Sequence, residues 1–119
     1  MIIQSLPENI CYFQISSLFL DPVALWLNLE LVNPIDPRQK IKLKLCDIAY
    51  FSVSKTPEDG EGCYLIGNIQ LSLWEDIALL YEKLNYKFSN VITDGSLYYL
   101  NIEGDICLDV ASKLCFVET

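Results

Sequence analysis

The residues able to do chemistry in this sequence are carboxylates, tyrosines and cysteines, because its 119 residues include no histidine. The missing histidine excludes Ser-His-Asp and Cys-His nucleophile pairs, and every metal site that needs an imidazole ligand. Acid–base catalysis by two carboxylates is not excluded, because Asp105 and Asp109 share one face of a predicted strand. Tyr98 and Tyr99 precede them in the sequence and could supply a further acid. Such even spacing is also typical of a solvent-facing strand. We therefore predict no catalytic residue, and keep a small ligand-binding domain or enzyme that uses carboxylates and tyrosine as an alternative.

The five cysteines, at positions 11, 46, 63, 107 and 115, follow no metal-binding pattern, because no two are spaced as C-x-x-C. All but Cys63 lie inside apolar runs, where free cysteine is commonly buried. We therefore predict reduced core cysteines, no metal, and a cytoplasmic location. Glycine-rich phosphate-binding motifs are also absent, which predicts that no cofactor is bound.

Half of the eight basic residues lie within one short segment, at Arg38, Lys40, Lys42 and Lys44. The three lysines alternate with Ile41, Leu43 and Leu45. Successive side chains of a strand point to opposite faces, so the lysines share one face. Phosphate contacts would need a basic surface, and the acidic body of this chain repels a polyanion, so we predict no nucleic-acid binding. Lys40, Lys42 and Lys44 become candidate partner-binding residues.

Acidic residues outnumber basic ones by sixteen to eight, which gives a net charge of −8. An acidic surface attracts basic proteins and speeds their encounter. The segment Thr56–Gly62 is predicted to be an exposed acidic loop, and it adds Glu58, Asp59 and Glu61 to the candidate partner-binding residues. Its acids lack the spacing of a calcium loop. We therefore expect a protein partner, preferably a basic one.

The elements that would position these residues are mostly strands. A run over 23–32 pairs with 40–46 across a turn marked by Pro34 and Pro37, and 48–54 follows as a further strand or a bent extension. Helical spacing predicts one helix over 73–87, with Ser72 and Glu75 as a capping box. An antiparallel meander closes the chain. The predicted fold is α+β, mostly β: a curved antiparallel sheet or a sandwich with one helix.

Residues 1–119 are predicted to form a single domain, because the length is that of one domain and no linker or repeat interrupts the pattern. No uncharged stretch reaches the roughly 18 to 20 residues of a membrane span, so we predict no membrane contact. The first residues also lack the basic region of a secretory signal.

Three segments carry a resemblance to a known group of proteins: the lysine strand, DIAYFSV over 47–53, and the hairpin LNIEGDICLDV over 100–110. With this pattern, over roughly residues 20–119, the chain resembles small uncharacterised bacterial β-rich domains, some of them grouped with immunity proteins of polymorphic toxin systems. The resemblance implies a non-enzymatic domain that binds a protein partner, and it transfers no functional residue. A second alternative is a homo-oligomeric structural or regulatory domain, for example a homodimer. It is suggested by the 52% of residues that are apolar, because surplus apolar surface can form a subunit interface.

Overall fold

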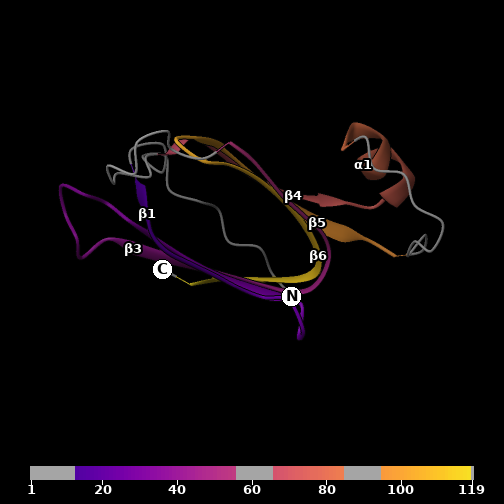
Figure 1. The fold of residues 1–119 in the computed structure, drawn as a ribbon, viewed down its shortest axis with the longest axis horizontal. Helices are drawn as coiled ribbons and strands as arrows, with labels where there is room; N and C mark the ends of the chain where they lie inside the picture. The colour runs from indigo at the N-terminus through magenta and orange to yellow at the C-terminus, as the bar shows by residue number, and fades with distance from the viewer. Residues whose placement is uncertain (1–12, 56–65, 85–94, 119) are drawn as a thin grey trace.

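The computed structural model describes residues 13–55, 66–84 and 95–118 (Figure 1). These residues form one antiparallel sheet in the order β1-β2-β3-β6-β5-β4, with a short helix after β4. The sheet is curved and unclosed, with β1 and β4 at its two edges, which confirms the predicted α+β, mostly β class. The elements are β1 (Gln14–Asp21), β2 (Trp26–Val32), β3 (Lys40–Lys55), β4 (Ile66–Trp74), α1 (Ile77–Lys83), β5 (Leu97–Gly104) and β6 (Cys107–Glu118).

The hairpin of β2 and β3 forms as predicted, with pairs running from Trp26–Cys46 to Val32–Lys40. The prediction that β2 begins at residue 23 is wrong. Asp21 Oδ1 accepts hydrogen bonds from the backbone N–H groups of Val23 and Ala24, both at 2.9 Å, and Leu25 takes a positive φ of 57°. This local capping makes residues 22–25 a turn, and it overrides the apolar character that suggested a strand.

Strand β3 is one bent strand of 16 residues, so 48–54 is an extension of the lysine strand. The bend lies at Asp47, whose φ is 55°, and the pairing with β6 shifts register between Ile48 and Tyr50. Such bulges bend a strand and increase its twist. In Figure 1 β3 and β6 both turn through this bend, so that the sheet folds over itself and encloses an interior.

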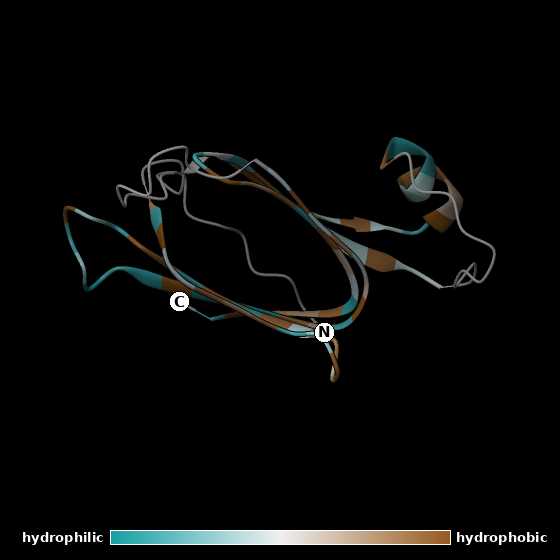
Figure 2. Cartoon of the chain, in the orientation of Figure 1, coloured by the Kyte–Doolittle hydropathy of each residue, from teal (hydrophilic) through white to brown (hydrophobic). Residues whose placement is uncertain are grey.

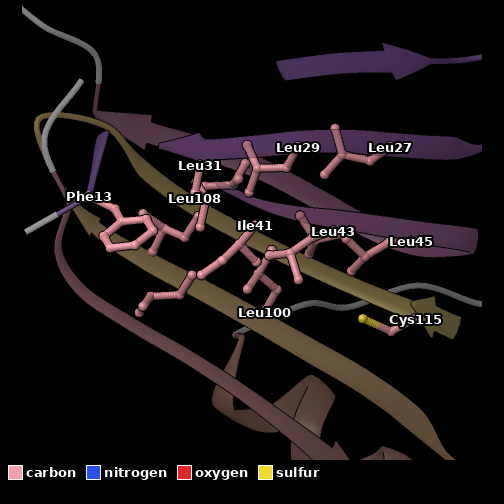
Figure 3. Close-up of a cluster of buried hydrophobic side chains, with 13 residues drawn as sticks. Phe13, Leu27, Leu29, Leu31, Ile41, Leu43, Leu45, Leu100, Leu108 and Cys115 are labelled. Atoms are coloured by element: carbon pink, nitrogen blue, oxygen red, sulfur yellow. The ribbon is translucent and has the colours of Figure 1, made fainter. Parts of the chain in front are cut away.

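The interior is filled by aliphatic side chains that alternate along the strands (Figure 3). Leu43 and Leu45 are at most 1% exposed, whereas their neighbours Lys42 and Lys44 are exposed. Burying each such leucine stabilises the fold by about 1.5–3 kcal/mol. The main cluster comprises Phe13, Leu27, Leu29, Leu31, Ile41, Leu43, Leu45, Ile69, Leu100, Ile102, Leu108, Val110 and Cys115.

The predicted helix over 73–87 is too long at its start, because β4 continues to Trp74 and α1 begins at Ile77. The helix cap is Asp76, whose Oδ1 accepts from the Leu79 N–H at 3.2 Å. Ser72 instead accepts a hydrogen bond from Trp74 Nε1 at 3.0 Å, so the predicted capping box does not form. Pairing with β5 holds 66–74 as a strand, and this long-range contact overrides the local helical spacing. Residues 85–87 lie outside the described part.

Helix α1 packs on the outer side of the sheet and forms a second, smaller cluster. Ile77 and Tyr81 are buried in it, as the predicted apolar stripe requires, and Trp74 and Leu84 pack against its border. Leu97, Tyr99 and Ala111 supply the sheet side of the cluster. None of the helices in the described ranges is long and apolar enough to cross a membrane.

Candidate functional site

Lys42 and Lys44 lie on the outer side of the sheet, away from the main core. Cross-strand pairing places them in two rows of four residues. The first row is Ser17, Glu30, Lys42 and Glu118, and the second is Phe19, Asn28, Lys44 and Phe116, each read from β1 through β2 and β3 to β6. A third row of Asp21, Trp26, Cys46 and Leu114 follows. We call these three rows the lysine face.

A hollow of about 360 Å³ lies on the lysine face. Side chains of the first two rows form its walls, while Leu29 and Leu43, which are buried on the opposite side, contribute at its floor. The full lining is Ser17, Asn28, Leu29, Glu30, Lys42, Leu43, Lys44, Phe116 and Glu118. The hollow therefore brings two ammonium groups, two carboxylates and an aromatic ring to one place.

Aromatic rings border the hollow on the side toward the turn at 22–25. The ring centroids of Phe19 and Trp26 are 5.3 Å apart, and Lys44 Nζ lies 5.9 Å from the centroid of Trp26. A cation over an indole ring at an exposed site gains about 0.5–1 kcal/mol. Phe19 is nevertheless 57% exposed and Phe116 is 48% exposed. These rings thus keep a large apolar surface in contact with water.

Exposed apolar side chains gather at this end of the molecule. Among the nine large hydrophobic residues that are exposed in the described ranges, five lie on the lysine face or in its adjoining turn: Phe19, Val23, Leu25, Leu114 and Phe116. The projecting turn between β1 and β2 is coloured as hydrophobic in Figure 2. Contiguous exposed apolar surface of this kind marks an interaction site.

The three predicted lysines are not equivalent. Lys42 and Lys44 line the hollow, whereas Lys40 lies at the start of β3, opposite Val32, and does not. None of the three forms an ion pair with a carboxylate that the structure describes; the ion pair found there joins Arg38 Nε and Asp36 Oδ1 at 3.0 Å. Lys42 and Lys44 are therefore available to a partner. Glu58, Asp59 and Glu61 lie outside the described residues.

Sequence analysis did not identify Trp26, Phe19 and Phe116 as parts of this site. One signal was present in the sequence: Trp26 shares the parity of Asn28 and Glu30, which is the polar side of β2. A tryptophan on a polar face is a candidate for binding. No comparable signal links Phe116 to Lys44, because they come from segments more than seventy positions apart.

A second polar cluster lies on the outer side of β5 and β6. Tyr99 Oη donates a hydrogen bond to Asp109 Oδ1, and Asn101 Nδ2 donates to the same oxygen at 2.9 Å. Burial, and then the hydrogen bond to Asp109, raise the pKa of the Tyr99 phenol well above its usual range. The phenol remains a protonated donor at neutral pH and ties the two strands together.

The predicted pairing of Asp105 with Asp109 on one strand does not occur. Asp105 lies in the bend before β6, and only Asp109 belongs to that strand. The tight Gly104-Asp105 turn ends the strand geometry there, so the even spacing no longer puts both acids on one face. In the parts of the chain described, no group of three acidic or cysteine side chains is placed to hold a metal ion.

In the part of the chain that the structure describes, Cys46 and Cys107 are free cysteines, and Cys115 is buried in the main core cluster. Burial, with a smaller effect of Cys46, raises the pKa of the Cys115 thiol to about 11. A thiol with a raised pKa is a poor nucleophile at neutral pH, because the thiolate is the reactive form. Cys115 therefore serves packing in the core. Cys11 and Cys63 lie outside the described residues.

Neither a protein-family model, nor a curated protein, nor a solved structure matches this chain.

Proposed function

We propose that this chain is a non-enzymatic domain that binds a protein partner through the lysine face. The observation that supports this is the joining of exposed aromatic and aliphatic side chains, around one hollow, to two lysines that form no ion pair with a described carboxylate. Aromatic residues are enriched where proteins bind one another, and they dominate the binding energy there. The resemblance to β-rich domains grouped with bacterial immunity proteins agrees with a binding role, so an immunity-like task is part of the proposal.

The charge of the chain favours a basic partner. At a net charge of −8 the long-range attraction acts on cationic proteins, and Glu58, Asp59 and Glu61 are the acids we propose to contribute most to it. Lys42 and Lys44 can each meet a carboxylate or an amide oxygen of the partner. The proposed partner surface is therefore apolar at its centre, with such oxygen atoms placed to meet the two lysines. The free thiols fit a reducing compartment, for which we propose the cytoplasm.

Co-purification of tagged variants from the native cells tests the proposal. Phe116→Ala removes a ring that is 48% exposed on the lysine face, and Leu79→Ala is the matched control, because Leu79 is 53% exposed on α1. A stoichiometric partner should be recovered with the wild-type chain and with Leu79→Ala, and its recovery should fall at least about tenfold with Phe116→Ala.

Binding to a basic partner should also weaken as salt is added, because screening reduces the attraction between exposed charges. Equal recovery of the same partner with Phe116→Ala and with the wild type would contradict the proposed face. A partner whose binding is unchanged between about 0.05 M and about 0.5 M salt would contradict the preference for a basic one.

A further inference from the structure

The first two rows of the lysine face are chemically complementary to a copy of themselves. A two-fold axis that runs parallel to the strands, over the gap between β2 and β3, places β2 of one chain over β3 of the other and β1 over β6. In the first row this sets Glu30 opposite the partner's Lys42, and Ser17 opposite the partner's Glu118. Each of these contacts occurs twice, because the interface is isologous.

The second row matches in the same way. The axis sets Phe19 opposite the partner's Phe116, and Asn28 opposite the partner's Lys44. An aromatic ring thus meets a ring and an ammonium group meets an amide oxygen, and both are favourable contacts. The exposed rings of Phe19 and Phe116 would be covered in such a pair.

Other positions of the axis do not give this match. An axis directly over β3 would set Lys42 against Lys42, Lys44 against Lys44, and Glu30 against Glu118. Like charges directly opposite one another are destabilising. An axis over the gap between β3 and β6 would leave β1 and β2 uncovered, because β5 pairs only with Leu108–Ser112 of β6 and not beside residues 116–118. Of these three axes parallel to the strands, only the one over the gap between β2 and β3 both covers all four strands and sets opposite charges against each other.

We infer that the protein bound by the lysine face is a second copy of this chain, which rests on the proposed binding through that face but replaces the basic partner by one with the same net charge of −8. With strands about 4.8 Å apart and successive rows about 6.8 Å apart, the face measures roughly 20 Å in each direction once side chains are included. That footprint, roughly 400 Å² on each chain, is about half of what each partner contributes to a standard interface. The pair is therefore a weak dimer.

Charge-swap variants test the arrangement by sedimentation equilibrium between about 1 and about 500 µM. Glu30→Lys sets two ammonium groups against each other at both copies of the contact, and Lys42→Glu does the same with carboxylates. Each variant alone should dimerise at least about tenfold more weakly than the wild type. An equimolar mixture of the two should form a heterodimer of wild-type strength, because every contact then joins opposite charges.

The rescue by mixing separates binding from folding, because the neighbours within each chain are the same in the mixture. Glu103→Lys and Lys83→Glu change the charge by the same amounts at exposed positions outside the lysine face, and both should dimerise like the wild type. Ser16 Oγ donates a hydrogen bond to the Glu30 carboxylate at 3.1 Å, so Glu30→Lys could unfold the chain. In that case Asn28→Lys replaces Glu30→Lys in the test, because Asn28 lies opposite the partner's Lys44. Its matched partner in the mixture is Lys44→Glu.

A wild-type chain that stays monomeric over the whole concentration range would overturn the inference, and so would single variants that no mixture rescues. The proposed function fails separately. If the chain is monomeric and Phe116→Ala still abolishes recovery of another protein, the face binds a different partner. If the chain is monomeric and Phe116→Ala changes no recovery, both the inference and the proposed face are wrong.

Discussion

Replacement of Asp109 by alanine should cost this protein a large part of its stability, although Asp109 is only half-buried. Its Oδ1 accepts hydrogen bonds from Tyr99 Oη and from Asn101 Nδ2. A hydrogen bond to a charged group contributes about 1.5–3 kcal/mol, and a buried donor without an acceptor costs about 1–3 kcal/mol. Tyr99 is 5% exposed, so little of its side chain contacts water, whereas Asn101 is half-exposed.

The expected loss for Asp109→Ala is therefore about 2–3 kcal/mol, carried mainly by the stranded Tyr99 hydroxyl. The total stability of a domain of this size is about 5–15 kcal/mol, so this loss is easily measured by urea unfolding. Tyr99→Phe removes the hydroxyl that donates to Asp109, so no donor is left without an acceptor when Asp109 is then replaced. In that background Asp109→Ala should cost about 1 kcal/mol or less, and the double-mutant cycle should report a coupling of about 1.5–2 kcal/mol.

Glu103→Ala is the matched control, because Glu103 is an exposed acid on β5, the strand of Tyr99, and should change the stability by less than about 0.5 kcal/mol. If the effects of Asp109→Ala and Tyr99→Phe simply add, the hydrogen bond carries no stability. Additive effects would thus contradict a structural role of this cluster in joining β5 to β6.

Two further predictions concern the alkaline limit of stability and the turn at 22–25. Because the pKa of Cys115 rises from 9.0 to about 11 on folding, the protonated thiol stabilises the folded state below pH 9, and about 2–3 kcal/mol of this is lost as the pH passes through 11. Urea unfolding at pH 8 and pH 11 should show a smaller fall for Cys115→Ala than for the wild type, and equal falls would refute the assignment. Leu25→Gly should raise the free energy of unfolding by about 0.5 kcal/mol, because glycine adopts the positive φ of 57° without steric cost. Ala24→Gly, at the neighbouring exposed position, should lower it by about 0.5–1 kcal/mol, and a stability loss in both variants would show that Leu25 is not strained.

The sequence by itself determined the properties that depend on near neighbours. The alternation of lysine and aliphatic residues over 40–45 was sufficient to predict which side of β3 is buried, because successive side chains of any strand point to opposite faces. The turn at Pro34 and Pro37 followed from the same local chemistry, since proline cannot continue a sheet ladder. The absence of histidine excluded whole classes of catalysis before any fold was known.

Only the tertiary structure decided what surrounds Lys42 and Lys44. Phe116 and Glu118 reach them through the pairing of β3 with β6, and the register shift between Ile48 and Tyr50 decides which residues of each strand remain on the outer side. The same long-range pairing kept residues 73 and 74 in β4, where their local spacing predicted the start of a helix. Register between segments so far apart depends on how the whole core packs, and a shift of one residue would turn every side chain of the strand to the other face.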